Sequence, residues 1–177
     1  MSYAHVINGI FIGSIDSIYD DNFLLKNNIK LIINCSNRNI KNSLGIKTYF
    51  LNGFFDIDFN SPQTPQIFVN NFEIINSYNY KFKIIDLINK TCEIMHNFKQ
   101  NYPNCGILVH CHAGVNRSAL TIVGYLKKLE GINTQYAINL LKNTNLVKRK
   151  KHALTNNYFM QQSSLITGLH HVTAIAG

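Results

Sequence analysis

The 177-residue sequence has no tryptophan, three prolines and nine acidic residues against seventeen basic ones. No apolar run reaches the roughly 20 residues of a membrane span, and the N-terminus lacks a signal-peptide layout. Four cysteines without a C-x-x-C pair argue against a disulfide framework or a zinc site. We therefore expect no metal, no cofactor and no membrane span, and an intracellular protein of a reducing compartment, the cytoplasm or the nucleus.

What the sequence does contain favours one compact domain, because 46% of its residues are hydrophobic. The net charge of +8 comes from only 15% charged residues, so a few lysine clusters carry it. The densest cluster spans residues 148–151 and predicts a solvated helix end or loop, with contact to an acidic partner as the alternative.

Alternating apolar patterns predict a single α/β domain, with a central, mainly parallel, twisted sheet flanked by helices. Strands are expected at 6–12, 30–34, 47–51 and 106–109. Helices are expected at about 16–27, 82–98, 118–129, 134–142 and 152–162. The Asn- and Pro-rich stretch 61–79 is expected to be irregular.

The most informative stretch is His110-Cys-His-Ala-Gly-Val-Asn-Arg-Ser118, which lies between a predicted strand and a predicted helix. At such a turn, backbone N–H groups converge and the helix N-terminus favours negative charge. A cysteine there is stabilised as the nucleophilic thiolate, and the fork of Arg117 suits two phosphate oxygens. Of the four cysteines, only Cys111 has an arginine at this spacing. The alternative, without a catalytic role, is a buried core cysteine beside a surface arginine.

This motif resembles the phosphate-binding loop of the cysteine-based protein tyrosine phosphatases, in particular their dual-specificity branch. The segments 10–14, 31–36 and 124–126 are similar to other strands and helices of that branch, and Asn156, Phe159 and Gln162 fit the spacing of its last helix. The resemblance covers roughly residues 3 to 162. We therefore predict a catalytic domain at 1–162 and a C-terminal tail of unknown role at 163–177.

The resemblance implies a role for each residue of the loop. Cys111 would be the nucleophile, Ser118 would donate a hydrogen bond to its sulfur, and His110 would orient the loop. Phosphate would be bound by Arg117 and by the backbone amides of the loop residues His112, Ala113, Gly114, Val115, Asn116 and Arg117. The side chains of His112 and Asn116, which vary in the family, are candidates for tuning specificity.

In the family, the general acid is an aspartate seven residues beyond a strand tyrosine. Counting from Tyr49 gives Asp56, with Asp58 as the competing candidate. Asp56 precedes Cys111 by fifty-five residues, more than is usual in the family. The surplus predicts an insertion at about 60–80, which could form a wall of the cleft.

The resemblance implies a protein phosphatase that acts on phosphotyrosine and phosphoserine/phosphothreonine through a cysteinyl-phosphate. Its partners would be phosphorylated protein substrates. One alternative is an RNA 5′-phosphatase of the same superfamily: Asn116 and the basic charge favour it, whereas Ala113 and the Ala119-Leu120 pair count against it, so nucleic acid is the less favoured partner. Another alternative is a non-catalytic phosphoprotein-binding module. The absence of lysine from the loop counts against a phosphoinositide phosphatase.

Overall fold

The computed structural model describes residues 1–70 and 73–166, and its centre is a five-stranded sheet in the order β1-β2-β7-β3-β4. The strands are β1 (Tyr3–Ile7), β2 (Ile10–Gly13), β3 (Ile29–Asn34), β4 (Lys47–Phe50) and β7 (Gly106–His110). All neighbouring pairs are parallel except β1 with β2. The mainly parallel sheet and the α/β class confirm the prediction.

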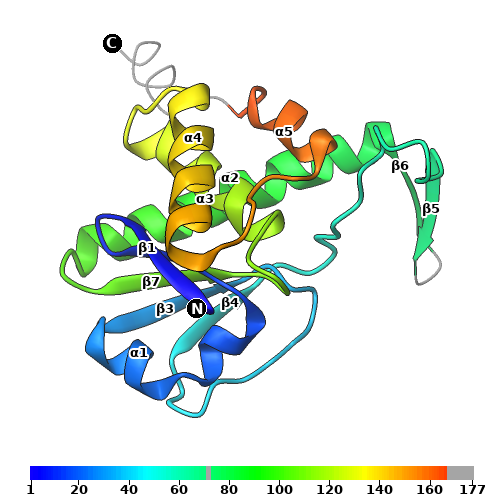
Figure 1. Ribbon diagram of the computed structural model, residues 1–177. Helices are drawn as coiled ribbons and strands as arrows, with labels where there is room; N and C mark the ends of the chain where they lie inside the picture. Colours follow the sequence, from blue (N-terminus) through cyan, green and yellow to red (C-terminus); the bar gives the residue numbers. More distant parts are fainter. Residues whose placement is uncertain (71–72, 167–177) are drawn as a thin grey trace, which may run out of the picture.

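Helices cover both faces of this sheet (Figure 1). One face carries α2 (Ser77–Asn101), α3 (Arg117–Leu129), α4 (Thr134–Thr144) and α5 (Asn157–Ser163). The other carries the 3-10 helix η1 (Ile15–Tyr19) and α1 (Asp21–Lys26). Central strand β7 serves both cores, since successive side chains alternate between faces: Ile107 and Val109 join the larger core and Leu108 the smaller.

The N-terminal prediction was wrong in detail, because the expected strand 6–12 is a hairpin of β1 and β2. Its turn is Asn8-Gly9, both with positive φ, of 47° and 74°. Asn-Gly favours this two-residue turn, and the apolar residues on either side of it hid the break. The helix expected at 16–27 is likewise two shorter helices, because Asp20 ends η1 and caps α1 by accepting from Phe23 N–H.

The stretch expected to be irregular, 61–79, contains a second, two-stranded sheet of β5 (Ile67–Asn70) and β6 (Glu73–Asn76). Figure 1 shows this hairpin projecting from the body of the molecule. It leads directly into α2, which begins at Ser77, earlier than predicted, because Asn76 and Asn79 form a reciprocal capping box. The last helix, α5, begins at Asn157 rather than near 152, because Asn156 caps it.

Residues 163–166 of the predicted tail continue the packed chain, since Ser163 and Ile166 are buried. The remainder of that tail, 167–177, lies outside the described residues. Within the described part of the chain, none of the helices has the length and apolarity needed to cross a membrane.

Candidate active site

The predicted loop lies where β7 ends at His110 and α3 begins at Arg117, at the carboxyl end of the central strand. Cys111 is only 3% exposed and is the first residue after the strand. Gly114 has a φ of +68°, and a Cβ there would lie 2.6 Å from the Gly13 carbonyl oxygen and from the guanidinium nitrogens of Arg149. The loop therefore requires glycine at this position, both for its conformation and for its close packing.

Two donors converge on the sulfur of Cys111. The Gly114 N–H donates to Sγ at 3.2 Å, and the Ser118 hydroxyl lies 3.2 Å from the same atom. Both contacts bring a group that can donate a hydrogen bond against the sulfur. Two other thiols, Cys35 and Cys92, are buried in the core, and burial raises the pKa of each to about 12. Cys111 therefore differs from these two cysteines in having both a backbone N–H and a hydroxyl against its sulfur, in the loop that leads into α3.

Arg117 is held beside the loop that carries the predicted acid. Its Nη1 donates to the Phe54 carbonyl oxygen at 3.3 Å, and its buried Nε has no hydrogen-bond partner among the described residues. The side chain is half-buried. A guanidinium with an unsatisfied donor is chemically suited to bind phosphate oxygens.

The structure separates the two acid candidates. Asp56 is exposed and faces the catalytic loop: one carboxylate oxygen accepts from Asn116 Nδ2 at 3.0 Å and the other from Asn156 Nδ2 at 2.8 Å. Asp58 instead accepts from the backbone N–H groups of Asn157 and Tyr158, both at 3.1 Å, at the start of α5. The position of Asp58 is thus that of a helix cap, whereas Asp56 contacts the loop that follows Cys111, through Asn116.

Asn116 occupies a position expected to tune specificity, but its side chain braces the loop instead. It is 9% exposed, and its amide oxygen accepts from Asn156 N–H at 3.1 Å and from the Thr155 hydroxyl at 3.2 Å. Its amide nitrogen holds Asp56, as described above. The other such candidate, His112, is exposed, together with Ala113.

His110 is 1% exposed and lies beneath the loop. Its Nδ1 is 3.4 Å from the Cys111 carbonyl oxygen, and its Nε2 has no hydrogen-bond partner within the described ranges. Burial lowers the pKa of His110 to about 4, so the imidazole is neutral near pH 7. This placement suits a residue that supports the loop.

Arg149 is a residue of the site that the sequence analysis missed. It was one of four basic residues, 148–151, expected to be solvated, yet it is 3% exposed. Its Nη2 donates to the Ala113 carbonyl oxygen at 2.9 Å, and its Nη1 bonds the Gly114 carbonyl oxygen and Asn145. Burial lowers the pKa of this guanidinium.

Asn145 completes the support, since its Nδ2 also donates to the Gly114 carbonyl oxygen, at 2.9 Å. Asn145 and Arg149 are the first and last residues of a short π-helical turn that follows α4. Such turns are frequent at functional sites. A run of basic residues does not indicate which one points inward, and the sequence held no other signal for this turn.

From the sequence, we expect no metal ion in the protein. Within residues 1–70 and 73–166, no group of three or more His, Cys, Asp or Glu side chains is arranged to hold a metal ion. The groups described above supply a thiol, amide donors, a guanidinium and a carboxylate.

Comparison with known proteins supplies the family. The model of the dual specificity phosphatase catalytic domain matches residues 10–166. The chain belongs to this family. It is 32% identical over 137 residues to a protein of Dictyostelium discoideum described as a dual specificity protein phosphatase, covering 76% of this chain and 53% of that protein. The chain thus spans about half the length of that relative.

Two further relatives are similar over nearly their whole lengths. A protein of Amsacta moorei entomopoxvirus, described as a tyrosine-protein phosphatase, is 26% identical over 182 residues, covering 99% of this chain and 92% of that one. The crystal structure of human DUSP28 superposes with a TM-score of 0.71 at 17% identity, covering 100% of this chain and 97% of that one. These findings confirm the predicted family resemblance and the predicted fold.

Proposed function

We propose that the chain is a protein phosphatase that hydrolyses phosphotyrosine and phosphoserine/phosphothreonine in protein substrates. The observation that carries the proposal is the convergence of the Gly114 N–H and the Ser118 hydroxyl on Cys111 Sγ, each at 3.2 Å, beside Arg117. Membership of the dual specificity phosphatase family supports it.

In the first step, the Cys111 thiolate attacks phosphorus in line and the bond to the leaving oxygen breaks. The loop amides and Arg117 bind the equatorial oxygens, where preorganised donors stabilise the charge of the transition state. Asp56 donates a proton to the departing oxygen of the tyrosine, serine or threonine. The products are the free hydroxyl and a cysteinyl-phosphate.

In the second step, water attacks the phosphorus and the sulfur–phosphorus bond breaks. Asp56, now a carboxylate, accepts the proton of the water. Ser118 donates its hydrogen bond to the sulfur as negative charge returns there. The residues beneath the loop, Arg149 and His110, hold its geometry through both steps.

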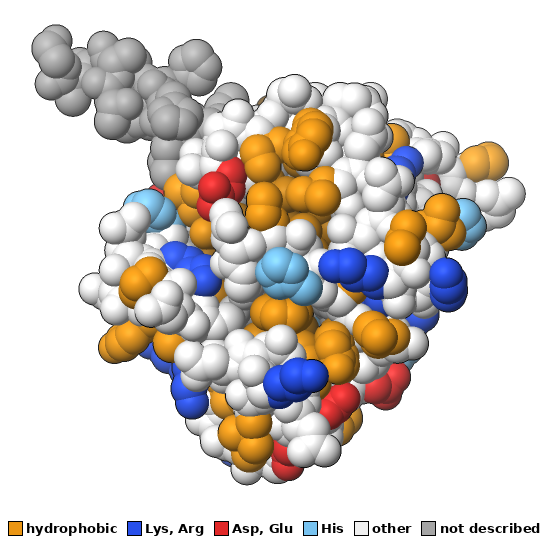
Figure 2. Space-filling model, turned by 60° about the vertical axis from the view of Figure 1, so that its left-hand side comes forward, with side chains coloured by type: hydrophobic (Ala, Val, Ile, Leu, Met, Phe, Trp, Pro, Cys, Tyr) orange, Lys and Arg blue, Asp and Glu red, His pale blue; other side chains and the backbone are white. Residues whose placement is uncertain are grey.

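The nucleophile must remain a thiolate, so we also propose that the protein works in a reducing compartment. All four cysteines are free. The RNA alternative would use a continuous basic surface to bind the nucleic-acid backbone. On the face shown in Figure 2, lysine and arginine side chains lie scattered among neutral and hydrophobic ones.

The test is phosphate release from a small aryl phosphate, from phosphopeptides and from 5′-triphosphorylated RNA, with reductant and without metal. We expect vanadate-sensitive turnover that falls by about 10⁴-fold or more in Cys111→Ser. Cys105→Ser, at a half-exposed cysteine outside the loop, is the matched control and should keep full activity. Preference for RNA would support the alternative substrate, and an inert wild type would support a binding module instead.

A further inference from the structure

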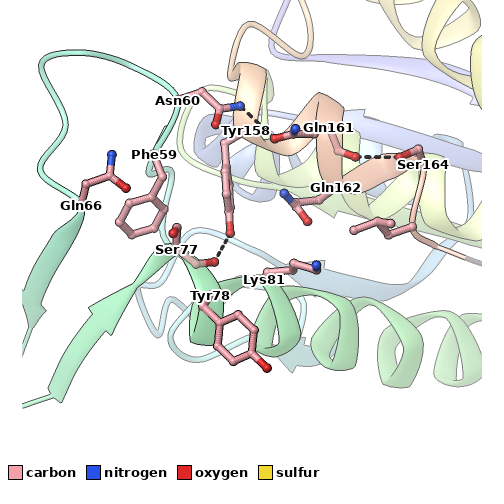
Figure 3. A pocket seen from close by; sticks show the side chains of 11 residues that line it. Phe59, Asn60, Gln66, Ser77, Tyr78, Lys81, Tyr158, Gln161, Gln162 and Ser164 are labelled. Carbon is pink, nitrogen blue, oxygen red and sulfur yellow. Dashed lines mark hydrogen bonds between the residues drawn. The ribbon is translucent and has the colours of Figure 1, made fainter.

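A cavity of about 540 Å³ lies next to the candidate active site, where the start of α2 meets α5. Figure 3 shows its lining side chains. They include Phe59 and Asn60, which follow Asp58 in the chain, Lys81 of α2, and Tyr158 and Gln162 of α5. No residue of the catalytic loop lines the cavity, so it is a separate site.

The lining contains one basic side chain and no acidic one. Lys81 is half-buried, forms no ion pair among the described residues, and lies in a lining that contains no aspartate or glutamate. Ser77 and Tyr78, the first two residues of α2, also line the cavity, and the first turn of this 25-residue helix contains no acidic residue. The positive end of the helix dipole and the ammonium group both favour an anionic ligand.

A second observation points to a ligand with hydrogen-bond donors. Gln162 is 4% exposed, and its amide oxygen has no hydrogen-bond partner in the part of the chain that the structure describes. Figure 3 shows this side chain reaching from α5 toward Lys81 on α2. Since an unpaired buried acceptor is costly, a ligand that brings an N–H group would be favoured here. A peptide with an acidic side chain supplies both the donor and the anion.

The cavity is within reach of a peptide whose phosphorylated residue lies at Asp56. Asn156, the cap of α5, contacts Asp56, whereas Gln161 and Gln162 of the same helix line the cavity. At a rise of about 1.5 Å per residue, the two ends of this path are roughly 8–9 Å apart along the helix. An extended peptide, at about 3.3 Å per residue, crosses this distance and enters the cavity within about three to five residues.

We propose that this cavity binds the carboxylate of an aspartate or glutamate side chain in the phosphoprotein substrate, three to five residues from the phosphorylated residue. Lys81 pairs with the carboxylate, and Gln162 accepts a hydrogen bond from the peptide. The inference rests on the proposed function and deepens it, because it assigns to the cleft a preference in substrate sequence.

The experiment measures kcat/KM on phosphotyrosine peptides in which one glutamate is moved through positions three, four and five on either side, against an uncharged peptide. We expect one position to raise kcat/KM by about 3- to 10-fold in the wild type. Lys81→Met should abolish this preference. Lys81→Glu should instead favour a peptide that carries lysine at the position where the wild type prefers glutamate. Lys90→Met, on the same helix but exposed and outside the cavity, should keep the preference.

Hydrolysis of a small aryl phosphate separates the two proposals, because that substrate cannot reach Lys81. It should be unchanged in all of these variants. If the wild type hydrolyses aryl phosphate and peptides but prefers no glutamate position, or if Lys90→Met loses the preference as fully as Lys81→Met, the cavity proposal is wrong and the phosphatase stands. If the wild type hydrolyses nothing, the proposed function falls and the cavity proposal falls with it.

Discussion

The catalytic loop and the β5–β6 hairpin are opposites in how they are held. The loop is fixed by hydrogen bonds from several sides. Asp56 accepts from Asn116, the π-helical turn donates to the Gly114 carbonyl oxygen, and Leu154 N–H donates to the Val115 carbonyl oxygen at 2.9 Å. The hairpin packs through one face, with Ile75 buried and Phe68 against the core. Its other face exposes Ile67, Val69 and Ile74 by 55–67%.

The difference shows where the fold demands one geometry and where it tolerates change. Each support of the loop fixes a group that would contact the phosphate, so losing any one of them should cost activity. The side chains on the other face of the hairpin are more than half exposed, so they should be exchangeable. The predictions below test this contrast.

The largest effect is expected for Asp56→Asn. Since this variant cannot donate a proton, kcat on an aryl phosphate with a poor leaving group should fall by about 10²–10⁴-fold, and by much less with a good leaving group. Asp58→Asn is the control: it should leave kcat nearly unchanged and cost less than about 1 kcal/mol of stability, because the asparagine oxygen can still accept a hydrogen bond at the start of α5. Equal losses of kcat in the two variants would refute the assignment of the acid.

The next effect is expected for Arg149→Met. Without the guanidinium, the carbonyls of Ala113 and Gly114 each lose one donor and the loop shifts, so kcat should fall by roughly 10²-fold. Lys150→Met, the adjacent exposed position, should keep wild-type activity.

Arg149→Lys separates positioning from folding, because it keeps the charge but cannot hold both carbonyls. We expect it to lower kcat while KM and the thermal midpoint change little. A fall in the midpoint with unchanged kcat would show that Arg149 serves stability alone.

The sequence could predict the parts of this site whose residues are close together in the chain. Cys111, Arg117 and Ser118 lie within one short motif, whose strand-to-helix context was evident. Asp56 and Asn156 lie far apart from the loop, and a family spacing was needed to find them. The inward turn of Arg149 depends on a π-helical turn and on a carbonyl thirty-five residues away, which no local pattern encodes.

The hairpin was missed for a related reason. The exposed Ile67, Val69 and Ile74 are as apolar as the inward-facing Phe68 and Ile75, so the alternation that marks a half-buried strand was absent. The Asn-Gly turn between β1 and β2, by contrast, was visible in the sequence, and the turn signal should have outweighed the apolar run.

A pH effect on stability is expected from His110, beneath the loop. Its pKa in the folded protein is about 4, below the ordinary 6.5, so the unfolded chain binds more protons between these values. The contribution of His110 is thus complete above pH 6.5 and is lost as pH falls toward 4, by up to about 3 kcal/mol. Denaturant unfolding at several pH values measures it.

His110→Gln is the comparison, since it keeps a polar side chain that does not titrate. The variant should be less stable at pH 7 but should lose less stability on acidification than the wild type. His5, whose pKa is also lowered by burial, remains in both proteins and contributes equally. Parallel stability curves would contradict a buried neutral His110.

The smallest effect is expected on the outer face of the hairpin. Ile74 and Ile75 are adjacent, but Ile74 is 60% exposed and Ile75 is 1% exposed. Ile74→Thr should change the free energy of unfolding by no more than about 0.5 kcal/mol and leave aryl phosphate hydrolysis unchanged. Ile75→Ala, the contrasting variant, should lower it by about 2–5 kcal/mol, because it opens a hole in the core. If Ile74→Thr were as damaging as Ile75→Ala, the outer face would be packed against something, and the two regions would not differ as the structure indicates.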